Sequence, residues 1–201
     1  MDGQEARHPH HPTVELARRA VETFVRRAAS SSTYLLRREE LARRAVEDFV
    51  SDDLVVEPIP LPDDLPERAG VFVTIRSRGA LRGCIGTIEP VSASLAEEII
   101  RSALLAATDD PRFPPVGSDE LSSLTYSVSV LGQVEPAPGL SDLDPARFGV
   151  IVQSGYRRGL LLPGIEGLDT PEKQLQAARR KAGIPSGAPF ETLRFETRHF
   201  E

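Results

Sequence analysis

The chain is poor in several residue types that often carry structure or chemistry. Its 201 residues include one cysteine, one methionine and no tryptophan. A lone cysteine excludes a disulfide within the chain, and it excludes the thiolate clusters that hold zinc or iron and sulfur. The sequence has no apolar run near the length of a membrane span, and its start lacks the pattern of a signal peptide. We therefore expect a cytoplasmic protein in a reducing compartment.

Lysine is scarce as well, and most of the positive charge is arginine. The formal net charge is −6, and Lys173 and Lys181 are the only lysines. This acidic balance argues against broad, sequence-independent binding to nucleic acid, which needs a basic surface. The length is sufficient for one domain or two closely joined subdomains with a substantial core.

The first twelve residues are polar, and His8, His10 and His11 alternate with Pro9 and Pro12. Three close histidines could bind a metal ion, but a proline-broken segment is poorly preorganised for fixed coordination geometry. We interpret residues 1–12 as a mobile tail, and we predict neither a metal site nor a cofactor.

A near-duplication follows the tail. Residues 15–25 read ELARRAVETFV and residues 40–50 read ELARRAVEDFV, so the copies differ only at Thr23 and Asp48. Apolar residues at helical spacing predict two amphipathic helices, joined by a turn at the serine-rich residues 30–33. The first helix and its linker, residues 13–34, are either a tolerated tandem duplication or a device that binds a partner or forms a homodimer. We expect residues 1–30 to be dispensable for folding and to serve association alone.

Hairpins and grouped helices follow residue 70. Val71–Ser77 is a predicted strand, and Arg78 and Gly79 turn it into a second strand that contains the cysteine. A helix begins at Ser94 and ends near Asp109. Further strands are predicted at residues 124–134, 148–153, 159–162 and 193–200, with a helix between Thr170 and Gly183. No repeating βαβ pattern occurs, so the fold class is α+β with mainly antiparallel sheet.

The cysteine strand is the most informative segment. Residues 81–87 read LRGCIGT, and strand alternation puts Arg82, Cys84 and Gly86 on one face and Leu81, Gly83 and Ile85 on the other. A neighbouring cation favours the thiolate, and the glycines allow a ligand or another backbone to come close. The alternative is that Cys84 is a small buried residue of the core.

A second unusual segment, DDPRFPP, occupies residues 109–115. Its prolines end the preceding helix. Asp109 and Asp110 then lie at a helix C-terminus, where negative charge opposes the helix dipole. A nearby cation must offset this cost, or a chemical function must explain the position of the two carboxylates. Arg112 is the cation closest in sequence.

LRGCIGT, DDPRFPP and SVSVL at residues 127–131 follow one another in the order and spacing of a known family. From residue 35 to the C-terminus the chain resembles the AMMECR-type domain family, in particular the branch called AmmeMemoRadiSam system protein A. The resemblance implies two α+β subdomains around a cleft, and the helix at residues 13–28 lies outside the family pattern. The positions carried over by the resemblance are Arg82, Gly83, Cys84, Gly86, Asp110, Arg112, Phe113 and Glu120.

The resemblance implies the company of a Memo-type protein and a radical SAM protein. The favoured function is an accessory or substrate-binding component, in which Gly83, Gly86, Arg112, Phe113 and Glu120 contact a ligand. The alternative is an enzyme for a small anionic substrate, with Cys84 as nucleophile or covalent carrier and with Arg82 and Asp110 as the other catalytic residues. Cysteine nucleophiles usually need a histidine, and outside the tail only His199 is available.

Overall fold

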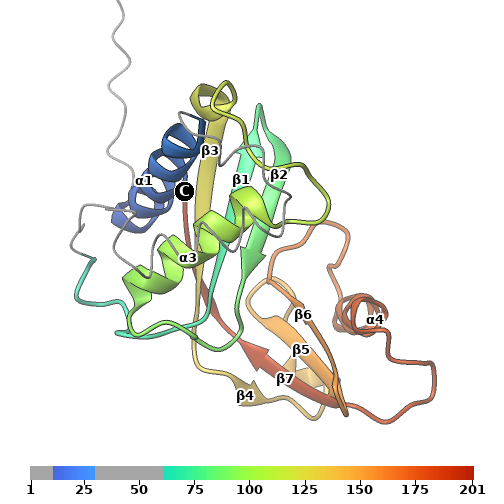
Figure 1. The fold of residues 1–201 in the computed structure, drawn as a ribbon. Helices are drawn as coiled ribbons and strands as arrows, with labels where there is room; N and C mark the ends of the chain where they lie inside the picture. The colour runs from blue at the N-terminus through green and yellow to red at the C-terminus, as the bar shows by residue number, and fades with distance from the viewer. Residues whose placement is uncertain (1–10, 30–60) are drawn as a thin grey trace, which may run out of the picture. The chain divides into compact units, whose positions relative to one another are not determined.

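The computed structural model describes residues 11–29 and 61–201, which belong to two compact units. The first unit extends to Val130 and includes His199–Glu201, and the second comprises Leu131–Arg198. Figure 1 shows the elements of both. His8, His10 and the second copy of the duplicated motif lie outside the described residues.

The first unit is a four-stranded sheet with two helices. Its strands are β1 (Val71–Ser77), β2 (Ala80–Gly86), β3 (Leu124–Leu131) and β8 (Thr197–Phe200), in the order β2-β1-β3-β8. Its helices are α1 (Pro12–Ala29) and α3 (Leu95–Thr108), and a short 3₁₀ helix (Leu121–Ser123) precedes β3. Both ends of the described chain belong to this unit.

The hairpin of β1 and β2 forms where the sequence predicts it. Arg78 (φ 51°) and Gly79 (φ 82°) are both left-handed, as a two-residue type I′ turn requires. The antiparallel register then shifts, because Ile75 pairs with Gly83 whereas Arg76 pairs with Leu81. One residue of β2 is thereby left without a partner, which is a β-bulge.

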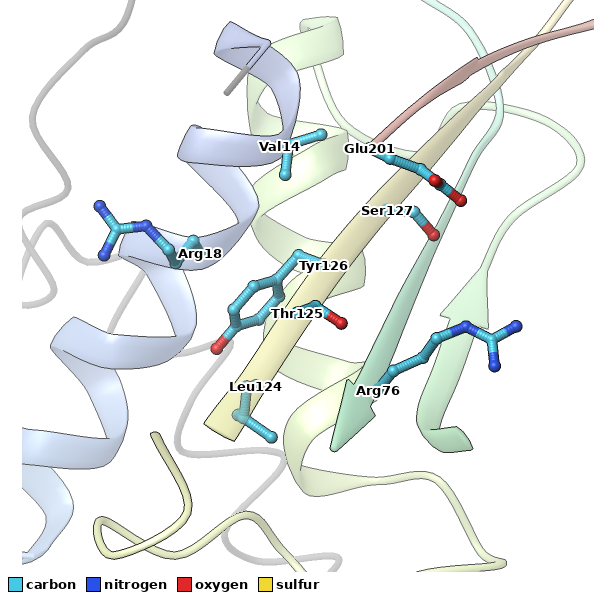
Figure 2. A pocket seen from close by; sticks show the side chains of 8 residues that line it. All are labelled: Val14, Arg18, Arg76, Leu124, Thr125, Tyr126, Ser127 and Glu201. Carbon is cyan, nitrogen blue, oxygen red and sulfur yellow. The ribbon is translucent and has the colours of Figure 1, made fainter. Parts of the chain in front are cut away.

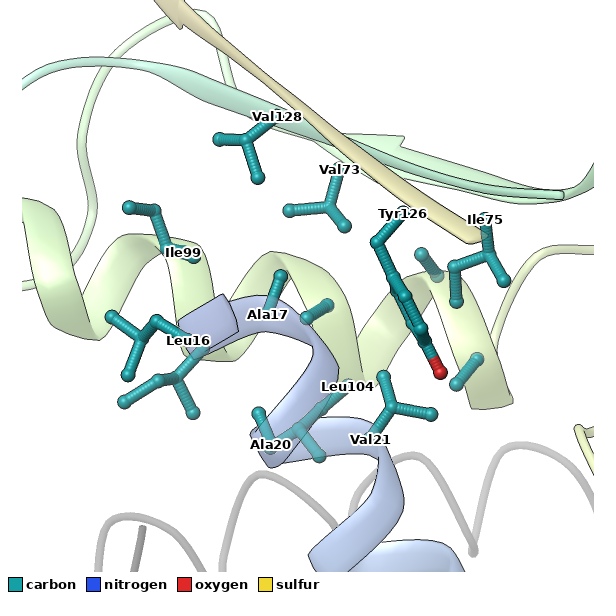
Figure 3. Packing of buried hydrophobic residues seen from close by; sticks show 14 of the residues in the cluster. Leu16, Ala17, Ala20, Val21, Val73, Ile75, Ile99, Leu104, Tyr126 and Val128 are labelled. Carbon is teal, nitrogen blue, oxygen red and sulfur yellow. The ribbon is translucent and has the colours of Figure 1, made fainter. Parts of the chain in front are cut away.

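The helix α3 is also predicted correctly. Ser94 caps its first turn by accepting a hydrogen bond from the Glu97 backbone N–H at 3.3 Å, and Asp109 ends it. Figure 3 shows α1 and α3 on the same side of the sheet, where Val73 and Val128 meet them. This side of the sheet is the main hydrophobic core of the unit.

The burial of α1 differs from the expectation for an extra helix. Leu16, Ala17, Ala20 and Val21 are at most 1% exposed inside the first unit. Its apolar face is therefore occupied within the unit, while a homodimer through this helix stays a prediction. Because this face contributes to the core, the view that the helix serves association alone does not agree with the structure.

The second unit is a smaller sheet with one helix. Its strands are β4 (Glu135–Pro136), β5 (Gly149–Ser154), β6 (Arg157–Leu161) and β7 (Glu191–Phe195), in the order β4-β7-β5-β6. α4 (Pro171–Ala182) begins after the capping residue Thr170 and ends at Gly183, which is left-handed at φ 65°. Val150, Val152 and Ala178 form the centre of its core.

The predicted last strand is two strands. β7 pairs with β4 and β5 in the second unit, whereas β8 lies beside β3 in the first. Glu196 separates them, and its carbonyl accepts a hydrogen bond from the Gly132 N–H at 2.8 Å. Alternation predicts extended backbone here, but it does not indicate which sheet each half joins. None of the helices described is long and apolar enough to cross a membrane.

Candidate functional site

The cysteine lies on β2, an edge strand of the first unit's sheet. Cys84 pairs with Thr74 of β1, and the Thr74 hydroxyl donates a hydrogen bond to Cys84 Sγ at 3.3 Å. The residue is half-buried. The thiol is therefore neither enclosed in the apolar core nor fully open to water.

The bulge in β2 falls at Arg82 and changes the predicted alternation. Paired residues share a face of the sheet, so the register places Leu81 on the same face as Cys84. The prediction that Leu81 shares a face with Gly83 is wrong, because the extra residue reverses the alternation beyond it.

The two glycines beside the cysteine make room for backbone. A methyl group on Gly83 would overlap the carbonyl of Ala106 in α3, and one on Gly86 would overlap the carbonyl of Val71. Gly83 thus allows α3 to pack directly against β2. This gives both glycines a packing role, while their contact with a ligand stays a prediction.

Asp110 is the centre of the polar cluster, although it is only 3% exposed. It accepts hydrogen bonds from the Cys84 N–H at 2.8 Å, from the Arg112 N–H at 3.1 Å, and from the Arg112 Nε and Nη2 at 2.9 and 2.6 Å. Burial by itself would raise its pKa, but these hydrogen bonds outweigh burial and lower the pKa of Asp110 to about 2. The carboxylate is therefore ionised at neutral pH and fixes Arg112 beside the cysteine strand.

Arg82 fastens the DDPRFPP segment to β2. Its Nε and Nη2 bind both carboxylate oxygens of Glu120 at 2.7 and 2.8 Å, and it donates to the carbonyls of Pro114 and Pro115. The Arg82 guanidinium and then the Gly117 N–H lower the pKa of Glu120 below its usual value. Paired charges of this geometry are strong and directional, so Arg82 and Glu120 position the segment.

Phe113 lies between the two arginines. The Arg82 guanidinium is 5.9 Å and the Arg112 guanidinium 5.4 Å from the centre of its ring, within reach of cation–π attraction. The structure therefore brings six of the predicted residues into one cluster: Arg82, Cys84, Asp110, Arg112, Phe113 and Glu120. Of the two arginines, Arg112 is the one offered to solvent, with 52% of its side chain exposed against 12% for Arg82.

His199 does not serve the cysteine. It lies on β8, with β1 and β3 between it and β2, which is roughly 14 Å across the sheet. Its Nδ1 pairs with the Ser129 hydroxyl at 2.9 Å and its Nε2 with Glu201 at 3.1 Å. The histidine that a cysteine nucleophile usually needs is thus not at Cys84 in the described part of the chain.

Two residues near the site were not predicted. Thr74 contacts the sulfur. The sequence indicates this residue only through its place on the predicted strand that pairs with the cysteine strand. Glu98 is fully buried and accepts hydrogen bonds from the Thr87 hydroxyl and from two backbone N–H groups of residues 91 and 92, which holds the chain after β2. In the sequence, Glu98 can be recognised as a carboxylate that falls among the apolar residues of α3.

A separate cavity of about 350 Å³ lies between α1 and β3 (Figure 2). Arg18, Arg76 and Tyr126 line it, and it contains none of the predicted site residues. The Tyr126 hydroxyl is buried and has no hydrogen-bond partner among the described residues. No group of three potential metal-ligating side chains occurs in residues 11–29 and 61–201.

The chain is thus an α+β protein of two antiparallel sheets with a cysteine–carboxylate–arginine cluster at the edge of the first. The AMMECR1 family model matches residues 39–201, and the chain belongs to this family. This confirms the resemblance seen in the three sequence motifs.

Its relatives come from bacteria and archaea. A Thermotoga maritima protein is 54% identical over 134 residues, covering 65% of this chain and 77% of that protein. A Clostridium acetobutylicum protein is 48% identical over 147 residues, which are 70% of this chain but only 31% of that protein. The crystal structure of an uncharacterised Pyrococcus horikoshii protein aligns with a TM-score of 0.70 and 31% identity, covering 93% of this chain and 88% of the other.

Proposed function

We propose that this AMMECR1-family protein is an accessory or substrate-binding component that acts with a Memo-type protein and a radical SAM protein. The observation that carries the proposal is the half-exposed guanidinium of Arg112, which the buried carboxylate of Asp110 fixes beside Cys84 and Phe113. A cation held in one geometry binds an anion without losing further side-chain freedom. The ligand class is a small anion or an acidic group of a partner.

Binding is favoured over catalysis because the cluster has no residue suited to move protons. The pKa of Asp110 is about 2, so this carboxylate is a poor general base near neutral pH. Arg82 and Glu120 neutralise one another and hold the loop in place. Arg112 is also paired, with Asp110, but half of its side chain is exposed, so it is the arginine that a charged ligand can reach.

The test measures affinity for the Memo-type and radical SAM proteins encoded in the same genome, by calorimetry with the full chain. Arg112→Gln should weaken binding to at least one of them about tenfold, the equivalent of one charge-assisted hydrogen bond. Arg180→Gln is the matched control, because Arg180 is exposed on α4 of the second unit. Equal affinities for Arg112→Gln and Arg180→Gln, or no binding by the unmodified chain, would contradict the proposal.

One observation favours the enzyme alternative, namely the Thr74 hydroxyl that donates to Cys84 Sγ. Such a hydrogen bond fixes the position of the sulfur, and cysteine sulfur is the atom that attacks an electrophile and then carries the covalent adduct. Intact-mass analysis of the chain purified together with its partners tests this function. A mass increase that hydroxylamine or a thiol removes, and that Cys84→Ser lacks, would establish Cys84 as a covalent carrier.

A further inference from the structure

α1 fills a groove in the core of the first unit. α3 and the strands β1 and β3 form the groove, and Figure 3 shows Leu16, Ala17, Ala20 and Val21 of α1 packed there. The residues of the first motif copy that are at most 2% exposed are Leu16, Ala17, Ala20, Val21, Phe24 and Val25. One apolar face of the helix therefore makes the contact.

The second copy of the motif has the same apolar face. Its residues at the equivalent positions are identical: Leu41, Ala42, Ala45, Val46, Phe49 and Val50. The single substitution between the copies, Asp48 for Thr23, falls at a position that is only half-buried in α1. A groove that accepts the first copy is therefore also complementary to residues 40–50.

Two further observations point to the second copy as an occupant. The AMMECR1 family model begins at residue 39, so it includes residues 40–50 and leaves out α1. Residues 51–60 connect the second copy to Leu61, which packs against the core of the first unit, and ten residues extend to about 33 Å. The linker therefore keeps the second copy within about 33 Å of Leu61, which is itself part of this core.

The flanks of the two copies favour α1. The buried Val14 corresponds to Glu39, whose charge is costly in the same place. Arg26 and Arg27 lie in the last turn of α1, where positive charge complements the helix dipole. In the second copy the residue that corresponds to Arg27 is Asp52, whose negative charge opposes the dipole. These differences should make α1 the more stable occupant of the groove and residues 40–50 the less stable one.

We propose that this groove is a docking site for residues 40–50, which replace α1 within the same chain. α1 holds the groove at rest, and its departure lets the second copy dock through the identical face. The exchange releases an amphipathic helix while the core of the first unit stays filled.

Fluorescence of a single introduced tryptophan reports which copy is docked, because the chain has none of its own. Phe24→Trp and Phe49→Trp are made separately, each with and without Val21→Asp, which places a charge in the contact face of α1. With Val21→Asp, emission from position 49 should move to shorter wavelength and emission from position 24 to longer wavelength. Unchanged emission from position 49 in a folded Val21→Asp chain would overturn the proposal.

Thermal unfolding of the full chain gives an independent test. Val21→Asp and Val46→Asp should each retain a cooperative transition, with Tm lowered by about 10 °C or less, whereas the double variant should lose it. Thr23→Asp is the matched control, since it makes the copies identical in residues 15–25 and 40–50 and should leave Tm nearly unchanged. A single variant that unfolds as completely as the double variant would show that one copy alone fills the groove. A folded Val21→Asp chain that is dimeric by light scattering would place the second copy in another molecule and would also overturn the proposal.

Discussion

The two faces of the first unit's sheet differ in the residues they present. On the face toward α1 and α3, Val73 pairs with Val128 and Ile75 with Tyr126, and all four are at most 6% exposed. On the other face, Cys84 pairs with Thr74, which in turn pairs with Ser127. The alternation of β1 and β3 thus separates an apolar side from a polar one.

This difference indicates that one face of the sheet stabilises the fold and that the other carries the reactive groups. Burial of the helix-side residues supplies most of the favourable free energy of folding, because it removes apolar surface from water. The row of Thr74, Cys84 and Ser127 contributes little burial, but it places a thiol beside hydroxyl groups at a sheet edge. Substitutions on the two faces should therefore affect different measurements.

The largest expected effect is on the helix side. Leu104→Ala should lower the free energy of unfolding by about 2–5 kcal/mol, because Leu104 is fully buried and leaves a cavity. Ser127→Ala on the polar face should change it by less than about 1 kcal/mol. Urea denaturation of both variants measures these free energies of unfolding. Equal losses in the two variants would contradict the assignment of stability to the helix side.

An intermediate effect is expected from Asp110 as the pH falls. Its pKa is about 2 in the folded chain and near 3.8 without partners, so its contribution is complete above pH 4 and is lost between about pH 4 and pH 2. The contribution should be about 2 kcal/mol. The unfolding free energies of the unmodified chain and of Asp110→Asn should therefore converge as the pH is lowered through this range. A difference that stays constant with pH would mean that Asp110 is not ionised by its neighbours.

The smallest effect concerns the thiol itself. Thr74→Val removes the hydroxyl that donates to Sγ, so iodoacetamide should label Cys84 about two- to tenfold more slowly at neutral pH. Since Cys84 is the only cysteine, the label is specific, and Ser127→Ala serves as the control. A thiol that reacts only after denaturation would instead belong to the interior of the protein.

Local signals in the sequence predicted the elements well. The turn at Arg78 and Gly79, the cap at Ser94 and the αL residue Gly183 are each determined within four or five residues of chain, and the structure confirms them. The family motifs also identified most of the cluster, because Cys84, Asp110 and Arg112 lie inside them.

Pairings between distant segments could not be predicted from local patterns. The bulge at Arg82 depends on how β2 registers with β1, and the Arg82–Glu120 ion pair joins residues 38 positions apart. The burial of α1 was missed for a different reason. Two nearly identical segments carry the same pattern, so periodicity alone cannot say which of them packs in the core.

The division of the last strand at Glu196 also bears on how the protein is made. β8, at residues 197–200, completes a sheet whose other strands end by Leu131, and the second unit lies between them in the chain. The second unit is therefore an insertion between β3 and β8, and nearly all of it is synthesised before β8. Until β8 is synthesised, the sheet of the first unit has an open edge beside β3. Closing that edge requires a contact between residues far apart in sequence, which makes it a slow and late step of folding.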